Sequence, residues 1–165
     1  ARAPAIPDGL VKTRIHGEYG LSQVLVAKGD ITILGFGGDP HRPLEDRRAK
    51  GTPLEDLAKM LRSFDQAAWA GVLRFAETDP VAVDELLPPA LAWRDLARAA
   101  FMGEYRTAID GCPSWPADSA AMDDLLLGFQ LRLLFLELEQ EATARPAWLR
   151  VPLHGILELF ADRGA

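Results

Sequence analysis

The sequence IHGEYGLSQVLVAKGDITILGFGGDP at residues 15–40 sets the organisation of the chain. It begins as a polar loop and ends as a glycine-rich loop. Between these loops, residues 23–27 and 31–34 are β-branched and apolar, and Lys28-Gly29-Asp30 joins them. This pattern predicts a β-hairpin. Polar side chains therefore gather at both ends of two apolar strands, which is where we expect any chemistry of the chain.

Most of the remaining sequence predicts helices. Thr52-Pro53 is a helix start, because threonine suits the N-cap and proline suits the first helical position. Apolar residues then follow at three- or four-residue steps to about residue 76. The other predicted helices are residues 90–109, 120–144 and 153–161. The helix at 120–144 is apolar on most faces, which predicts that it is the central helix of a bundle.

These elements predict an α+β fold that is mainly α, with a small hairpin packed on a helical bundle. A length of 165 residues with 48% hydrophobic residues fits a single domain, residues 1–165. Its expected parts are a lead-in at 1–14, a loop-and-hairpin segment at 15–43 and a bundle at 52–162. Within the lead-in, residues 11–15 are predicted as a short strand.

Charge, cysteine content and apolar runs argue against several kinds of partner and cellular location. The net charge of −6 argues against nucleic acid as a partner. Cys112 is the only cysteine, so no internal disulfide can form, which fits a reducing, cytoplasmic location. The first ten residues lack the apolar segment of a signal peptide. The apolar-rich run at 125–138 contains Arg132 and Glu137 and is too short to span a bilayer, so no membrane partner is expected.

Two motifs carry a resemblance to a known family. His16-Gly17-Glu18, followed by Gln23, and Gly-Phe-Gly-Gly-Asp-Pro at 35–40 resemble the catalytic and metal loops of aminoglycoside-phosphotransferase-like kinases. Within that superfamily they are similar to the maltokinases, including those fused to trehalose synthase. The family pattern HGDYHLGQVL, ILDFEGEP, RPL-ERR and SPL-DVA-MLRSF corresponds here to HGEYGLSQVL, ILGFGGDP, RPLEDRR and TPLEDLAKMLRSF. The resemblance implies a kinase-like C-terminal lobe without the N-terminal lobe that holds the lysine for the ATP phosphates.

The resemblance also implies roles for individual residues. Glu18 stands at the position of the catalytic Asp, with one more methylene, and acts as the base or as a loop-organising carboxylate. His16 positions the loop. Gln23 is a metal ligand that the maltokinases share, but Gly35 replaces the Asp that would complete the magnesium site. Asp39 is the acidic group left in the second loop and the other candidate metal ligand.

Substrate contacts are predicted at the far end of the bundle. Arg145 and Trp148 lie in a segment that matches an RPxW ending of the family, and they are the candidate substrate residues. The positions of the family's sugar-binding Lys and Tyr fall at about Leu133 and Leu136, where neither function is retained.

Two functions remain open on these grounds. The first is a catalytically impaired maltokinase-like lobe that serves as a structural or regulatory module. Its expected partner is a trehalose synthase-type catalytic domain, with maltose as a possible ligand and no cofactor for the chain alone. The alternative is part of an active maltokinase that uses ATP and Mg²⁺ to make maltose 1-phosphate.

Overall fold

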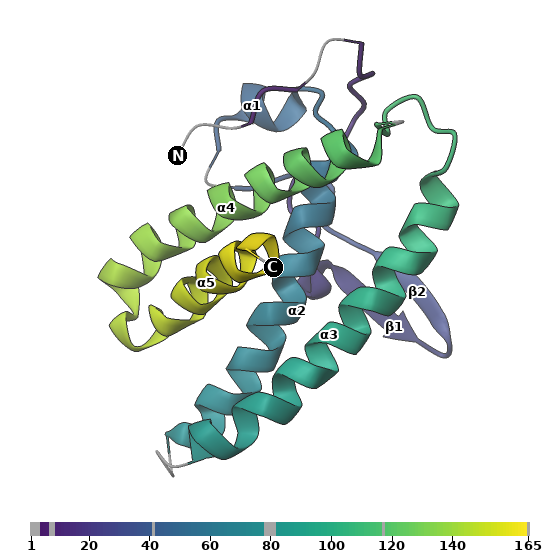
Figure 1. Cartoon of the computed structure of the whole chain (residues 1–165). Coiled ribbons are helices and arrows are strands. Elements are labelled where there is room, and N and C mark those ends of the chain that lie inside the picture. The colour runs from purple at the N-terminus through teal and green to yellow at the C-terminus, as the bar shows by residue number, and fades with distance from the viewer. Residues whose placement is uncertain (1–3, 7–8, 41, 78–81, 117, 165) are drawn as a thin grey trace.

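The computed structural model describes residues 4–6, 9–40, 42–77, 82–116 and 118–164. The elements in chain order are η1 (Leu21–Gln23), β1 (Val24–Ala27), β2 (Asp30–Ile33), α1 (Leu44–Arg48), α2 (Pro53–Ala76), α3 (Ala82–Ile109), α4 (Ser119–Ala144), η2 (Pro146–Trp148) and α5 (Arg150–Gly164). In Figure 1, α2 and α3 form a long pair, and α4 and α5 lie side by side across α2. The predicted α+β, mainly α, architecture is confirmed.

The predicted hairpin is present. β1 and β2 are antiparallel, with Val24 opposite Ile33 and Ala27 opposite Asp30. The connecting residues Lys28 and Gly29 both have positive φ, 53° and 86°, as a type I′ turn requires. The strands pair with each other, and their apolar side chains stay largely exposed, as Val26 (68%) and Ile31 (70%) show.

The predicted strand at 11–15 is wrong. Thr13 forms only an isolated bridge with Gly51, in which each backbone N–H donates to the other residue's carbonyl at 2.9 Å. Gly51 belongs to a turn before α2, so no neighbouring strand is present to extend the pairing beyond this bridge.

The start of α2 is as predicted. Thr52 is the N-cap and its hydroxyl accepts from the Leu54 N–H at 3.4 Å, with Pro53 in the first turn. The prediction that the helix at 120–144 is the central one is wrong, because α2 contacts α3, α4 and α5 and supplies the most deeply buried side chains, such as Leu57 at 0% exposure. On α4, Phe135 is 46% exposed, so part of its apolar surface faces solvent.

The predicted start of a helix at residue 90 is also wrong, since α3 begins at Ala82 and continues through Pro88 and Pro89. Each proline removes a backbone donor from the helix but fixes φ near the helical value. The later part of α3 is held against α2 by ion pairs from Arg94 and Arg98 to Asp65, which favours continuation of the helix on both sides of the prolines.

The C-terminal helices close the bundle. Asp118 caps α4 by accepting from the Ala120 N–H at 2.9 Å. α5 is longer than the predicted 153–161 and packs on α4. The main core is formed by apolar residues of α2 and α4: Leu54, Leu57, Ala58, Leu61, Met122, Leu125, Leu126 and Phe129.

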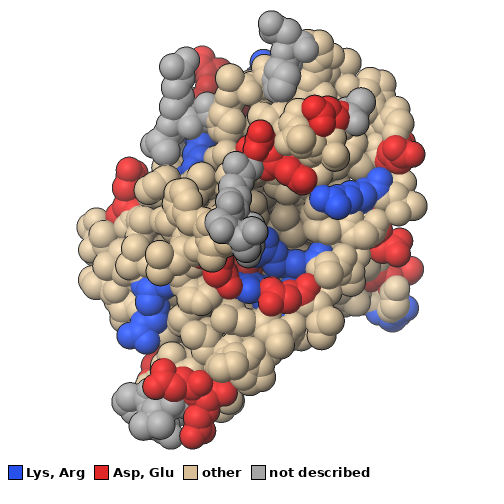
Figure 2. Space-filling view, in the orientation of Figure 1, with Lys and Arg blue, Asp and Glu red and all other residues tan. Residues whose placement is uncertain are grey.

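A buried ion-pair network lies among α2, α3 and α5. Arg62, Arg94 and Arg98 all contact Asp65, with N–O distances of 3.1 to 3.4 Å. The cavity beside this network has a volume of about 440 Å³. Figure 2 shows basic and acidic side chains adjacent to one another around a hollow on this face of the molecule.

The described helices include none that is both long enough and apolar enough to cross a membrane.

Candidate functional site

The segment at 15–18 is held on α2 by one carboxylate. Asp56 accepts from the His16 backbone N–H at 2.6 Å and from the Gly17 backbone N–H at 2.8 Å, one on each oxygen. Gly17 has φ +81°, and a Cβ there would lie 3.2 Å from the Gly38 Cα. Glycine therefore allows the first loop both to turn and to approach the second loop closely.

His16 joins the first loop to the end of the hairpin. Its Nε2 lies 2.6 Å from the Leu34 carbonyl oxygen, and its Nδ1 accepts from the Glu18 backbone N–H at 3.2 Å. Because Nδ1 accepts, the proton of the ring lies on Nε2, which donates to Leu34. The residue is only 8% exposed, and its ring contacts Phe36 at 4.9 Å between centroids. This geometry supports a positioning role for His16.

Glu18 forms an ion pair with α2. The Lys59 ammonium donates to Glu18 Oε2 at 2.5 Å and to the Gly17 carbonyl at 2.6 Å. The Glu18 side chain is 42% exposed, whereas that of Lys59 is 22% exposed. One carboxylate oxygen of Glu18 therefore faces Lys59, and the other has no partner shown among the described residues.

A polar groove of about 330 Å³ lies beside this ion pair, between η1, α2 and α4. Its lining combines carboxylates, amides, cations and two leucines: Glu18, Tyr19, Gly20, Ser22, Asp39, Lys59, Arg62, Ser63, Gln66, Leu133, Leu136, Glu137 and Gln140. Two of the predicted site residues, Glu18 and Asp39, thus share one groove. Burial, and secondarily the Asp56 charge, raises the pKa of Tyr19 above its ordinary value.

The Glu137 carboxylate on the far wall is fixed by α2. Arg62 donates to it from Nε at 2.9 Å and from Nη2 at 2.7 Å, and Gln66 Nε2 donates to it at 3.1 Å. Arg62 is 5% exposed, so this carboxylate is held by a buried guanidinium. The groove therefore has one rigid acidic wall at Glu137 and a second acidic group at Glu18.

The two predicted metal ligands, Gln23 and Asp39, do not line one common groove. Gly35 has φ +77°, and a Cβ built there would lie 2.1 Å from Gln23 Oε1. The Gln23 side chain thus occupies the space next to Gly35 in which a carboxylate would have to stand. Asp39 lines the groove at Glu18, which does not include Gln23. Among the described residues no group of three or more His, Cys, Asp or Glu could hold a metal ion. In kinases Mg²⁺ is held by one or two carboxylates together with the substrate phosphates, so the assignment of Gln23 and Asp39 as metal ligands remains a prediction.

Arg145 and Trp148 lie in a neighbouring cavity of about 200 Å³, which shares Gln66 and Glu137 with the groove. The Arg145 guanidinium stacks 4.5 Å above the Trp148 ring and pairs with Glu141. Both predicted substrate residues are therefore together, but beyond the Gln66–Glu137 hydrogen bond rather than beside Glu18.

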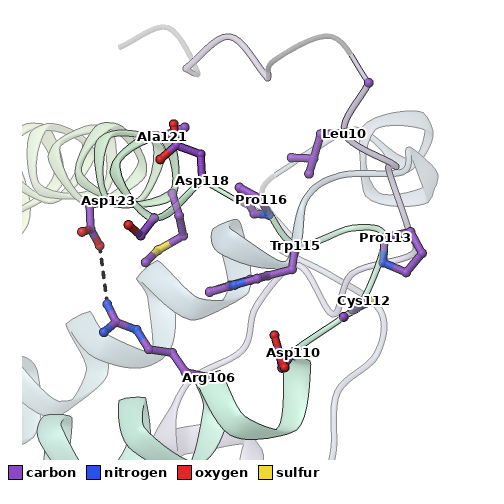
Figure 3. Close-up of a pocket in the computed structure, with 14 residues that line it drawn as sticks. Leu10, Arg106, Asp110, Cys112, Pro113, Trp115, Pro116, Asp118, Ala121 and Asp123 are labelled. Atoms are coloured by element: carbon purple, nitrogen blue, oxygen red, sulfur yellow. Dashed lines mark hydrogen bonds and ion pairs between the residues drawn. The ribbon is translucent and has the colours of Figure 1, made fainter.

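A cavity larger than the groove lies away from this site. It has a volume of about 1060 Å³ between the lead-in, the turn after α3 and the start of α4. Figure 3 shows the Trp115 ring directed into it and the Arg106–Asp123 ion pair at one side. A hydrogen bond from the Ser114 hydroxyl lowers the pKa of the Cys112 thiol. None of the predicted site residues lines this cavity, so its size does not make it the candidate site.

The residues that the sequence reasoning missed include four polar residues on one face of α2: Asp56, Lys59, Ser63 and Gln66. Ser63 accepts from the Leu21 N–H at 3.1 Å, so all four contact the first loop or line the groove. A signal was present, because steps of three and four residues place these side chains on one helical face, opposite the apolar face.

We expect Asp56→Asn to lower the free energy of unfolding by about 1–2 kcal/mol, because an amide offers one acceptor oxygen to two backbone N–H groups. Burial raises the pKa of Asp56 above its ordinary value of 3.8, against the opposing backbone hydrogen bonds. The folded protein therefore holds this proton to higher pH than the unfolded chain does. The stability that Asp56 contributes is greatest at low pH and declines as pH rises through the folded pKa.

Urea unfolding of both proteins at pH 3 and pH 7 measures this difference. The gap between wild type and Asp56→Asn should be smaller at pH 7. Asp30→Asn, on the exposed hairpin, is the matched control and should change stability by less than about 0.5 kcal/mol. A gap that widens with pH would contradict the expected direction.

Known proteins support the fold and correct the predicted function. No family model matches the chain. The chain is 27% identical over 149 residues to a glucosamine kinase from Streptacidiphilus jiangxiensis, covering 90% of this chain and 32% of that protein. A crystal structure of a glucosamine kinase (crystal form B) superimposes with a TM-score of 0.68 and 24% identity over 91% of this chain and 34% of the other. A glucosamine kinase in complex with glucosamine, ADP and inorganic phosphate gives a TM-score of 0.67 and 23% identity, over 91% and 35%.

The chain thus has a kinase-like fold and spans about a third of the length of these relatives. The prediction of a maltokinase-like module of trehalose and maltose metabolism is wrong, because the relatives found are glucosamine kinases. The motifs that suggested maltokinases form the loops, the hairpin and the first part of α2. The predicted partner, a trehalose synthase-type domain, rested on the same resemblance and remains an untested prediction.

Proposed function

We propose that this chain is the acceptor-binding part of a sugar kinase-like protein, and that its groove binds an amino sugar of the glucosamine class. The observation that carries the proposal is the acidic, polar groove beside the first loop, with Glu18, Asp39 and Glu137 in its lining. The name of the relatives, glucosamine kinase, supports the choice of an amino sugar.

The groove offers the groups that an amino sugar needs. Carboxylates at Glu18 and Glu137 can accept from an ammonium group and from hydroxyl groups, and such charge-assisted hydrogen bonds are stronger than neutral ones. Gln140 adds an amide, while Leu133 and Leu136 offer apolar surface to the C–H face of a pyranose ring. In sugar kinases a carboxylate at the position of Glu18 orients the attacking hydroxyl.

Nucleotide use is proposed for the protein as a whole, since one of the related structures contains ADP. The chain spans about a third of the length of these relatives, and Gly35 stands where the resemblance places a magnesium-binding Asp. We therefore assign to this part of the protein the binding and orientation of the acceptor, and we expect the chain alone to bind the sugar without phosphorylating it. Arg145 and Trp148 are proposed to contact the acceptor at the outer end of the groove, through the neighbouring cavity.

Calorimetric titration of glucosamine and of glucose into the protein tests the proposal. We expect glucosamine to bind about fivefold more tightly, because hydrogen bonds to charged groups contribute roughly 1 kcal/mol more than neutral ones. Glu18→Gln should remove most of this preference. Glu139→Gln makes the same charge change at an exposed position on α4 outside the groove and should leave it intact. Equal affinity for the two sugars, or no binding of either, would overturn the proposal.

A further inference from the structure

Lys59 contacts the first loop at two points, and the sequence resemblance assigned it no role. Its ammonium donates to Glu18 Oε2 and to the Gly17 carbonyl, at 2.5 and 2.6 Å. We propose that Lys59 is a positioning residue, which holds the longer carboxylate of Glu18 in the orientation needed to bind the acceptor sugar. The inference rests on the proposed function of the groove.

The need for such a contact follows from the side chain at position 18. Glutamate has one more rotatable bond than aspartate, so its carboxylate can occupy more positions in a half-exposed groove. A displacement of about 1 Å at a reacting or binding group can cost up to roughly a hundredfold in rate. A donor fixed on α2 limits this freedom, and because an ammonium engages only Oε2, the other oxygen stays available to the acceptor.

The position of Lys59 is itself well defined. It stands one turn after Asp56, which binds the backbone N–H groups of His16 and Gly17. It therefore contacts both the backbone and the side chain of the segment that Asp56 already anchors. An exposed ion pair alone contributes little, but the added bond to a backbone carbonyl ties this pair to the loop.

The charges in the groove favour the same role. Asp39 and Glu137 share the lining with Glu18, and Arg62 is engaged with Glu137. Without the Lys59 ammonium, repulsion from the remaining acidic groups would push the Glu18 carboxylate away from the groove, toward solvent. Lys59 thus offsets the charge of Glu18 inside the groove.

A double-mutant cycle separates this role from a general structural one. We expect Lys59→Met to weaken glucosamine binding about tenfold when Glu18 is present. In the Glu18→Asp background the same change should cost less than about twofold, because the shorter carboxylate does not reach Lys59. Lys59→Arg should retain most of the affinity. Lys12→Met, an equal charge change at an exposed position, should have no effect. Equal losses in both backgrounds would overturn the inference.

A second measurement needs no sugar. NMR relaxation of the Glu18 side-chain methylenes should show greater mobility in Lys59→Met than in wild type or Lys12→Met, and unchanged mobility would overturn the inference. If glucosamine does not bind but the mobility changes as expected, the proposed sugar is wrong and the positioning role of Lys59 stands. If glucosamine binds and the mobility does not change, the proposed function stands and the positioning role is wrong.

Discussion

Arg62→Met is expected to lower the free energy of unfolding by about 3–5 kcal/mol, the range found when one partner of a buried ion pair is removed. Arg62 is 5% exposed and donates to Glu137 from both Nε and Nη2. It also contacts Asp65 at 3.4 Å. Asp65 keeps Arg94 and Arg98, whereas Glu137 would lose its buried cation, so most of the cost is expected at Glu137.

Chemical denaturation measures the free energy of unfolding of Arg62→Met, and two further variants serve as controls. The double variant Arg62→Met with Glu137→Leu removes both charges and should recover more than half of the loss. Arg106→Met removes an exposed guanidinium, which pairs with Asp123 at 3.5 Å, and should cost less than about 1 kcal/mol. A loss for Arg62→Met as small as that for Arg106→Met would show that the buried pair is not a determinant of stability.

Gly155→Ala is expected to lower the free energy of unfolding by about 1–3 kcal/mol, although alanine is the better helix former. Gly155 lies on α5 where this helix packs on α4, and an added Cβ would be 2.8 Å from Leu134 Cδ2 and 3.2 Å from Arg62 Nη1. Leu134 is 2% exposed and Arg62 is held by its ion pairs, so neither can move away freely.

Gly103→Ala is the matched control with the opposite expected sign. Gly103 is an exposed residue of α3, and a Cβ added there would meet nothing within 4 Å. We expect this change to raise the free energy of unfolding by about 0.5–1 kcal/mol. Thermal unfolding of both variants beside wild type gives the two signs directly. A stabilising Gly155→Ala would mean that α5 can shift away from α4 at little cost.

Local patterns were sufficient for much of the fold. Thr52-Pro53 marks a helix start through interactions within a few residues, and Thr52 is the N-cap of α2 in the structure. The Lys28-Gly29 turn likewise follows from the backbone conformations that these residues accept. Such features depend on neighbours in sequence, so the sequence alone could predict them.

Features that depend on distant partners were not predicted. The continuation of α3 through Pro88 and Pro89 accompanies contacts with α2 that lie outside any local window. The sequence of α4 is more uniformly apolar than that of α2 and therefore suggested the wrong central helix. The apolar residues of α4 lie partly at the surface and along the groove. Hydrophobicity reports how much surface is available for burial, but not which helix the others surround.

The candidate site was predicted in part. Glu18 and Asp39 line the same groove, as their place in the loops suggested, but Gln23 lies beside Gly35 at the base of the hairpin. The α2 residues Asp56 and Lys59 come from about forty positions further along the chain, and only the fold shows that they meet the first loop. The loop motifs alone could not predict the composition of the groove, because Lys59 and Glu137 in its lining come from α2 and α4.

The two faces of α2 have a shared consequence for how this protein can change over evolutionary time. One face of α2 packs into the core through Leu54, Leu57 and Leu61. The opposite face of the same helix contacts the first loop and η1 through Asp56, Lys59 and Ser63. A core substitution that tilts α2 must therefore also displace the first loop, which the opposite face of α2 contacts. Changes in core packing and changes in the geometry of the groove are therefore coupled through α2. We expect a substitution on the core face of α2 to be compensated by a second substitution on its loop-facing side.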